Sequence, residues 1–465
     1  MPNDLREFEA DLARALTRVE RHTRFVEVLA ERVAGERLTL DSRSVTPARR
    51  PRVQGAIFRA WGNGRWLEAA TSALDEASIA SAAEVLGRML EAGGTGGEPP
   101  GPSASATHEW IERPERPITD LGIPAMISLA RDVLSWARQV PGIQDCQVVM
   151  GWAREERFYV NSSGARTYRR FERVRGDCLP IASEGGKTEF DVLFEGGVGG
   201  QERFGFLTQE NVMETSRKAC TLLHAGAPPT GEMAVLLDPS TSGTFAHESF
   251  GHGTEADQFL RDRSYLKPLL GSTLGPPFLT IADDGAFPGG WGTIFSDDEG
   301  HPCRRTLLVD HGQFVGALHD RETAAAYRVT ATGNTRRSDF LSRAFVRMTN
   351  TFVEPGDWTF EELVREAGTG VLMETATSGI EDPQGGQMQL KVKKGRRIEH
   401  GELGETVTSM ALSGKVLDFL RAIRGISRKS DFEISPGTCG KGQTDMLPTG
   451  TGGTYLLSTA VVGPA

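Results

Sequence analysis

The stretch Thr241–Asp257 reads T-S-G-T-F-A-H-E-S-F-G-H-G-T-E-A-D and places two histidines and an acid within a short segment. The metal-binding pattern H-E-x-x-H sets its histidines four residues apart on one face of a helix. Here His247 and His252 are five residues apart, and Glu248 follows the first of them. In a regular helix, residues five apart lie about 140° apart around the axis, so both imidazoles would reach one metal ion only through a distortion.

The residues around His252 favour such a distortion. Gly251 and Gly253 flank it, and glycine tolerates unusual backbone conformations. We therefore expect a π-bulge or a break near Gly251 that turns both imidazoles to one side, and such bulges cluster at functional sites. A regular helix with partly exposed histidines is the alternative.

Two histidines do not complete a catalytic zinc site, which takes three protein ligands and an open position. Cys439 is the best candidate for the third ligand, because it lies between glycines in the polar segment S-P-G-T-C-G-K-G-Q. Lys441 would favour its thiolate form. An exposed loop thiol is the alternative for Cys439. Cys146 and Cys220 lie beside apolar residues and are expected to be structural thiols.

The acids near the histidines have different expected roles. Glu248 adjoins a ligand and suits the general base that hydrolysis by an activated water needs. Glu255 and Asp257 could accept hydrogen bonds from the imidazoles and so orient them. The alternative is that these two acids are solvated.

The composition is that of a globular chain, with 38% hydrophobic and 25% charged residues. The formal net charge of -10 argues against binding to nucleic acid. No run approaches the ~18 apolar residues of a membrane helix, so no membrane association is expected. The charged start is unlike a secretory signal. Five cysteines without a C-x-x-C pair suit a reducing cytoplasm.

The pattern of the chain predicts an α+β fold in several parts. An N-terminal α/β subdomain with hairpins and helices is expected over residues 1–92. A flexible linker is expected over 93–107, because G-G-T-G-G-E-P-P-G-P-S-A-S-A-T has almost nothing that can pack. A central α/β subdomain follows over 108–228, and a large β-rich C-terminal domain over 229–465.

Individual elements follow from periodicity and turn signals. We expect helices over 3–20, 73–92, 123–139, 208–224, 359–367 and 411–424. We expect hairpin turns at 62–64, 162–164 and 311–312, a turn near Gly395, and a strand over W-G-T-I-F at 291–295.

The sequence resembles the TldD/PmbA metallopeptidase family, specifically its TldD-type active subunit. The residues that carry the resemblance are H-E-S-F-G-H-G-T-E-A-D and G-T-C-G-K-G-Q. Further matches, in order along the chain, are Y-V-N-S-S-G near Val160, D-D-G-A-F-P-G-G-W-G-T-I near Asp284, S-D-D-E-G-H-P near Asp298, A-T-G-N-T-R-R near Gly333 and M-T-N-T-F near Asn350.

The resemblance implies a zinc peptidase whose ligands are His247, His252 and Cys439 and whose catalytic base is Glu248, with one Zn²⁺ per chain. It implies a C-terminal metallopeptidase domain and a dimer, either of two copies or with a TldE/PmbA-like chain that lacks the metal motif. It implies unfolded or extended peptides as substrates, held by strand addition in an enclosed site, in proteolysis or peptide maturation.

The chain departs from the family pattern beside Cys439. K-G-Q after the cysteine is one residue shorter than usual, and P-T-G-T-G-G-T-Y-L-L replaces the usual tail. A non-catalytic peptide-binding subunit and a zinc hydrolase of a non-peptide substrate stay open as alternatives. No motif identifies the natural substrate, the cleavage specificity or the residues that line a peptide site.

Overall fold

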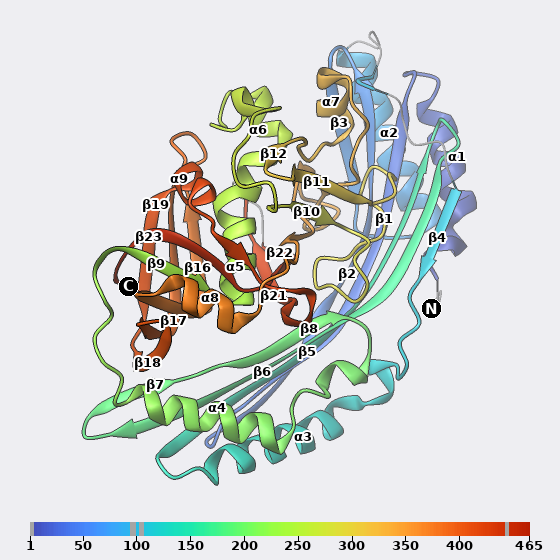
Figure 1. Cartoon of the computed structure of the whole chain (residues 1–465). Helices are drawn as coiled ribbons and strands as arrows, with labels where there is room; N and C mark the ends of the chain where they lie inside the picture. The colour runs from blue at the N-terminus through green and yellow to red at the C-terminus, as the bar shows by residue number, and fades with distance from the viewer. Residues whose placement is uncertain (1–3, 94–98, 102–106, 442–445) are drawn as a thin grey trace.

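The computed structural model describes residues 4–93, 99–101, 107–441 and 446–465, without the side chains of residues 49–51. The predicted α+β class is confirmed: one large curved sheet wraps around a β-rich C-terminal half (Figure 1). The predicted linker lies mostly outside the described residues, as does the K-G-Q departure beyond Lys441. Among the described residues, no helix is long and apolar enough to cross a membrane.

The large sheet has eight strands in the order β3-β2-β1-β5-β6-β4, with β7 and β8 also paired to β6. Its strands are β1 (Val26–Leu40), β2 (Val45–Gly62), β3 (Arg65–Thr71), β4 (Thr107–Ile111), β5 (Ile143–Asn161), β6 (Arg166–Glu184), β7 (Lys187–Phe190) and β8 (Leu193–Val198). The helical segments of this half are η1 (Leu5–Phe8), α1 (Glu9–Val19), α2 (Glu76–Gly93), η2 (Ile118–Asp120), α3 (Gly122–Arg138), η3 (Gln201–Phe204) and α4 (Gln209–Leu222).

The segments before and after the predicted linker share this sheet. β1 pairs with β5 in antiparallel register from Glu27↔Asn161 to Leu40↔Val148. The described strands therefore form one continuous layer across the segments 1–92 and 108–228, whose division into two subdomains stays a prediction.

The helices cover the convex face of the sheet (Figure 1). α1 and α2 enclose one apolar core against β1, β2 and β3, and α3 and α4 enclose a second against β5 and β6. The predicted helices 3–20, 73–92, 123–139 and 208–224 are confirmed within a few residues. The hairpin at Asn63-Gly64 is confirmed too, with both residues at positive φ as a tight turn requires.

The C-terminal half contains two main sheets. In one, the order β16-β9-β23-β19-β17-β18 closes on itself because β16 also pairs with β17. Its strands are β9 (Gly231–Leu237), β16 (Gly370–Glu381), β17 (Gln387–Glu399), β18 (Glu402–Val407), β19 (Met410–Lys415), β23 (Leu456–Pro464) and the short β20 (Gly425–Ile426).

The other main sheet has the order β12-β11-β10-β15-β22-β21. Its strands are β10 (Ile281–Asp284), β11 (Arg305–Asp310), β12 (Gln313–Phe314), β15 (Asn350–Val353), β21 (Glu433–Cys439) and β22 (Leu447–Gly453), and β13 (Thr335–Arg336) pairs separately with β14 (Phe345–Val346). The helical segments of this half are α5 (Pro239–Thr244), η4 (Phe245–Phe250), η5 (Gly251–Thr254), α6 (Ala256–Leu260), η6 (Lys267–Leu269), α7 (Arg321–Tyr327), α8 (Phe360–Ala367), α9 (Val416–Arg421) and η7 (Lys429–Asp431).

Three local predictions in this half are wrong. The predicted helix 411–424 begins as strand β19, which pairs with β17 and β23, and only α9 is helical. No turn lies near Gly395: β17 continues to Glu399, and a Cβ at Gly395 would lie 2.3 Å from the Leu372 carbonyl oxygen of the neighbouring strand. The segment 291–295 is a folded-back loop whose Ile294 and Phe295 amides donate to the Gly285 carbonyl.

The concave face of the large sheet meets the C-terminal half through buried ion pairs, here called the sheet interface. Arg59 pairs with Glu27 of β1 and with Glu299 of the loop between β10 and β11. Asp298 of that loop pairs with Arg157 and Arg169. The S-D-D-E-G-H-P motif therefore joins the two halves of the molecule.

Candidate metal centre

The segment that carries the histidines starts at the end of a strand. β9 ends at Leu237, and Asp238 caps helix α5 by accepting hydrogen bonds from the Thr241 amide at 2.7 Å and the Thr375 amide at 2.8 Å. Pro239 takes the first helical position, where its missing N–H costs nothing. The strand and its cap therefore fix where the following turn begins.

The turn itself is distorted as predicted. Residues Phe245–Phe250 form a π-helical turn, and Gly251–Thr254 continue as a 3₁₀ turn. A Cβ at Gly251 would lie 2.1 Å from Met348 Sδ, so any larger residue there would have to displace the Met348 side chain. The regular-helix alternative is excluded.

The distortion brings His247, His252 and Cys439 together. Their ligand atoms all lie within 4.8 Å of one another. The Cys439 Sγ lies 3.3 Å from His252 Nε2, and the imidazole centroids are 5.3 Å apart. Two histidines and a thiolate are a donor set that zinc prefers.

The glycine-rich sequence around Cys439 suggests a loop, but Cys439 does not lie in one. It is the last residue of strand β21 and is 2% exposed, which excludes the exposed-thiol alternative. Burial alone would raise the pKa of its thiol, but His247 and His252 lower that pKa to about 4. The thiolate that a metal ligand requires is therefore the favoured form.

His247 carries the clearest sign of a missing partner. It is 1% exposed, and neither ring nitrogen has a hydrogen-bond partner among the described residues. A buried polar group without a partner costs about 1–3 kcal/mol. A metal ion on one ring nitrogen would satisfy it, so these side chains fit a zinc ion.

Glu248 lies beside this cluster and stays partly accessible. Its Oε2 is 3.6 Å from His252 Nε2, and its side chain is 24% exposed. Glu248 packs over strand β16, where a Cβ added at Gly379 would lie 2.6 Å from the Glu248 Cβ. A carboxylate in this position can reach both the cluster and solvent.

Glu255 and Asp257 are buried, so the solvated-acid alternative is wrong. Glu255 is 0% exposed, and its Oε2 lies 3.3 Å from His252 Nδ1. Burial would raise the pKa of Glu255, but Lys441 and His252 lower it to about 2. Lys441 Nζ lies 2.9 Å from Glu255 and 2.7 Å from Asp257, so it links Asp257 to the carboxylate that contacts His252.

Two residues near the centre were not predicted from the sequence. Arg347, 1% exposed, donates from Nη2 to the Cys439 carbonyl, and its Nε lies 3.9 Å from Glu255 Oε1. A charge inside the apolar run A-F-V-R-M was its visible signal. Burial raises the pKa of Glu381 to about 8, and both of its carboxyl oxygens are buried without a hydrogen bond in the described part of the chain. No local pattern marked Glu381.

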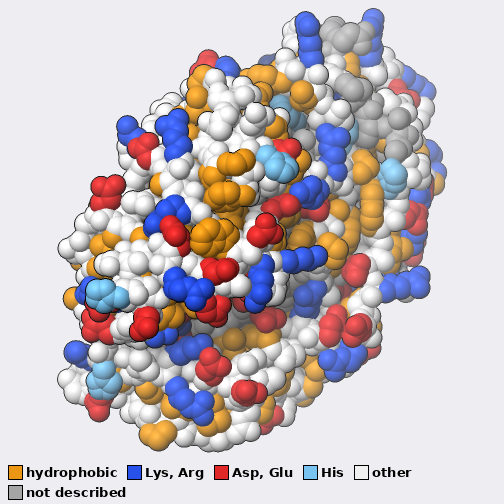
Figure 2. All heavy atoms as spheres, in the orientation of Figure 1, with side chains coloured by type: hydrophobic (Ala, Val, Ile, Leu, Met, Phe, Trp, Pro, Cys, Tyr) orange, Lys and Arg blue, Asp and Glu red, His pale blue; other side chains and the backbone are white. Residues whose placement is uncertain are grey.

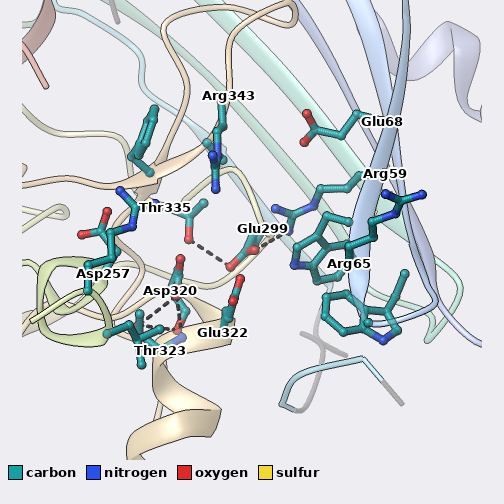
Figure 3. Close-up of a pocket in the computed structure, with 17 residues that line it drawn as sticks. Arg59, Arg65, Glu68, Asp257, Glu299, Asp320, Glu322, Thr323, Thr335 and Arg343 are labelled. Atoms are coloured by element: carbon teal, nitrogen blue, oxygen red, sulfur yellow. Dashed lines mark hydrogen bonds and ion pairs between the residues drawn. The ribbon is translucent and has the colours of Figure 1, made fainter. Parts of the chain in front are cut away.

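A large charged cavity of about 630 Å³ lies near the centre, but none of the three candidate ligands lines it. Figure 3 shows Asp257, Asp320 and Glu322 on one side of it and Arg59, Arg65 and Glu68 on the other. Three of these six charges have ion-pair partners: Arg59 pairs with Glu299, Glu68 with Arg337, and Asp257 with Lys441. Asp257 connects this cavity through Lys441 and Glu255 to His252.

Two protein-family models match the chain. The PmbA/TldA metallopeptidase C-terminal domain matches residues 230–461, and the PmbA/TldA metallopeptidase central domain matches residues 116–225. A metalloprotease of Methanothermobacter thermautotrophicus is 32% identical over 418 residues, 89% of each chain. A zinc metalloprotease TldD homolog of Saccharolobus solfataricus is 32% identical over 230 residues, 49% of this chain and 51% of that one.

Solved structures share the fold. TldE from Thermococcus kodakarensis aligns with a TM-score of 0.77 at 17% identity, covering 98% of this chain and 100% of that one. A structure from Thermotoga maritima aligns with a TM-score of 0.80 at 20% identity, with coverage of 98% and 100%. The family models and the similarity to the Methanothermobacter protein over 89% of each chain together show that this chain belongs to the PmbA/TldD metallopeptidase family.

Proposed function

We propose that this chain is a zinc-dependent peptidase of the TldD type that cleaves unfolded or extended peptides. His247, His252 and Cys439 hold one zinc ion per chain, and Glu248 is the general base. The observation that carries the proposal is the buried His247, whose ring nitrogens have no hydrogen-bond partner among the described residues, near a Cys439 thiolate and with the accessible Glu248 carboxylate beside His252.

The roles follow from the chemistry of each side chain. Bound zinc would supply Lewis-acid polarisation of a water and of a peptide carbonyl. As the general base, Glu248 would take a proton from the attacking water and deliver it to the leaving amine. Glu255 holds the Nδ1 side of His252, so its Nε2 points at Cys439 and Glu248. Lys441 and Arg347 keep Glu255 ionised.

An open strand edge beside Glu248 supports an extended peptide as substrate. β9 pairs with β16 only from Gly370 to Met373, whereas β17 follows β16 to Glu381. Beyond Met373, one edge of β16 has no strand partner in the part of the chain that is described. Gly379, on this free stretch, packs against Glu248. A peptide added to that edge would pass the base through main-chain hydrogen bonds.

The assembly and the compartment are also proposals. We expect a dimer, of two copies or with a TldE/PmbA-like chain, because one neighbour in fold is a TldE. We expect a cytoplasmic protein, because Cys146 and Cys178 lie 3.5 Å apart as free thiols, which a reducing compartment preserves.

The decisive experiment measures zinc and turnover on one sample of Glu248→Gln. The amide is nearly isosteric and is not a ligand, so zinc should stay near one per chain. Turnover of an unfolded peptide should fall at least ~10²-fold, the lower range for a lost general base. Full zinc with normal turnover would overturn the role of Glu248, and lost zinc would make it a support of the metal.

The same measurements on the wild type separate the alternatives. Zinc without turnover of any unfolded peptide, together with tight peptide binding, would indicate a non-catalytic subunit. Zinc without peptide binding would indicate a hydrolase of another substrate class.

A further inference from the structure

A second hollow, here called the arginine cavity, lies between the concave face of the large sheet and the ribbon formed by β21 and β22. Its volume is about 240 Å³. Gly151 and Ala153 of β5 lie at its floor. The cavity is also lined by Arg37 of β1 and by Arg173 and Arg175 of β6. The C-terminal half contributes Trp291, Thr438 and Pro448 to its lining.

The register of the sheet explains why this hollow exists and why it is basic. Arg37 lies opposite Gly151, which lies opposite Arg175, and Ala153 lies opposite Arg173 in the next row of the same face. Small side chains in the middle strand thus leave space between arginines on the outer strands. The alternate residues, such as Met150 and Val174, point the other way into the core under α3.

The cavity contains buried donors without acceptors. Arg173 is 2% exposed; its Nε donates to Glu155 and its Nη2 to the Thr293 carbonyl, but its Nη1 is buried with no partner among the described residues. Trp291 is 9% exposed, and its indole Nε1 is likewise buried without an acceptor in the described structure. Buried donors in native proteins normally have acceptors, so two in one hollow indicate a missing ligand.

The charges around this hollow do not cancel. Glu155 pairs with Arg173, and Asp177 with Arg175. Arg37 has no carboxylate partner in the described part of the chain. An adjoining hollow of about 270 Å³ shares Ala153, Glu155, Trp291, Thr438 and Pro448 with the arginine cavity and adds Arg336.

Arg336 is held by carbonyls and by no described carboxylate. It donates to the Met348 and Pro448 carbonyls, both at 2.8 Å, and is 4% exposed. Burial and the neighbouring cations Arg173 and Arg347 lower the pKa of Arg336 to about 9. The region therefore carries excess positive charge in a chain whose net charge is -10. An anion would relieve that excess.

We propose that the arginine cavity binds a carboxylate group of an extended peptide, supplied by its C-terminus or by an acidic side chain. Indole and guanidinium N–H groups suit the two oxygens of a carboxylate. That the carboxylate belongs to a peptide rests on the proposed function; that the cavity takes an anion does not.

The position of the cavity makes it an anchor and not a place of reaction. Thr438 lines it and directly precedes Cys439 in strand β21. Successive side chains of a strand point to opposite faces, so the cavity and the metal ligands lie on opposite sides of this ribbon. A carboxylate bound there would hold a peptide near the metal centre without touching the cleaved bond.

Binding of matched peptides tests the proposal. The zinc-loaded Glu248→Gln protein would be titrated by calorimetry with three unlabelled unstructured decapeptides, all acetylated at the N-terminus: one neutral with a C-terminal amide, one with a free C-terminus, and one amidated with a single glutamate. At least one carboxylate peptide should bind about 10-fold more tightly than the neutral one, as expected for a charge-assisted hydrogen bond. Whichever peptide does so identifies the source of the carboxylate.

Two further substitutions locate the effect. Trp291→Phe keeps an aromatic ring but removes the N–H, and Arg37→Gln removes the unpaired charge; both should abolish most of the preference. Trp61→Phe is the matched control, because the Trp61 Nε1 is also buried with no partner in the described part of the chain, but Trp61 lines the charged cavity. It should keep the full preference.

Several results would overturn the proposal. Equal affinity for all three peptides would refute a peptide carboxylate as the ligand. If inorganic phosphate then bound to the wild type but not to Trp291→Phe, the ligand would be a free anion. A preference that survives both Trp291→Phe and Arg37→Gln would place the site elsewhere. Turnover by the wild type is a separate readout. A carboxylate preference without turnover would refute the peptidase function but support carboxylate binding in the arginine cavity. Turnover without a carboxylate preference would support the peptidase function and refute carboxylate binding.

Discussion

The turn that carries His247 and the sheet interface that carries Asp298 are both deeply buried, yet their polar atoms differ in their partners. At the interface, Asp298 meets Arg157 and Arg169, and Glu299 meets Arg59. In the turn, neither ring nitrogen of His247 has a hydrogen-bond partner among the described residues. The comparison shows that burial alone does not distinguish a structural charge from a functional one. A complete set of partners indicates structure, and a buried group without a partner indicates an absent ligand.

The surface follows a third pattern. Figure 2 shows acidic and basic side chains interspersed over the face that it presents. Exposed ion pairs such as Lys218–Glu214 contribute little to the free energy of unfolding, because water already solvates both members. They provide controls for the buried regions.

The largest effect is expected from removing a proposed zinc ligand, either in the turn or at the end of β21. Cys439→Ser and His247→Ala should each lose most of the zinc and reduce turnover to background, because two ligands do not complete the site. Zinc content by elemental analysis and turnover on an unfolded peptide are the measurements. Cys220→Ser is the control. The Cys220 thiol donates to the Pro141 carbonyl and does not belong to the cluster of His247, His252 and Cys439, so this variant should keep its zinc and its turnover. Equal zinc in all three variants would refute the ligand assignment.

The next effect tests the interface. Asp298→Asn removes the charge that two buried arginines face and should lower the free energy of unfolding by about 3–5 kcal/mol, because a buried cation is left uncompensated. Urea denaturation measures it. Zinc bound per folded chain should not change. Glu214→Gln, in an exposed pair, should cost under about 1 kcal/mol. A loss of zinc from folded Asp298→Asn protein would show that the two regions are coupled.

A smaller effect is expected between the regions, at the carboxylate that supports His252. Glu255→Gln should weaken zinc binding by about 10–100-fold, the usual cost of losing a partner of a ligand histidine, while the protein stays folded. Competition with a chelator measures the affinity. Unchanged zinc affinity would show that Glu255 is a structural acid, like Asp298 at the sheet interface.

The smallest effect concerns pH. Burial would raise the pKa of Asp298, but Arg157 and Arg169 lower it from 3.8 to about 2. A lowered folded-state pKa contributes stability that is fully present above about pH 4 and is lost as the pH falls towards 2, at most about 2 kcal/mol here. The difference in unfolding free energy between wild type and Asp298→Asn should therefore shrink over that window. A constant difference from pH 5 to pH 2 would contradict the ion-pair assignment.

Much of the candidate centre could be predicted from the sequence. His247, Glu248 and His252 belong to one short segment, and Gly251 signalled its distortion. The family motifs supplied Cys439, although its burial at the end of β21 was not visible in a glycine-rich segment. The burial of Glu255 and the contact of Arg347 with Cys439 depend on strands that lie about a hundred residues or more away in the chain.

Local interactions explain what the sequence by itself determined. Helix α8 starts with a capping box between Thr359 and Glu362, and the turn at His311-Gly312 places both residues at positive φ. Such hydrogen bonds and backbone preferences involve residues only a few positions apart, so a pattern in the sequence is sufficient to predict them. The π-helical turn belongs to the same class.

Only the tertiary structure decided which residues share a sheet and which charges are satisfied. β1 and β5 join across the predicted linker, the segment from Met410 to Lys415 becomes a strand because β17 and β23 pair with it, and the arginine cavity forms where Gly151 lies between Arg37 and Arg175. Cross-strand pairing and burial depend on partners distant in the chain. Their free energies override local propensity, and one sequence read in order does not contain those contacts.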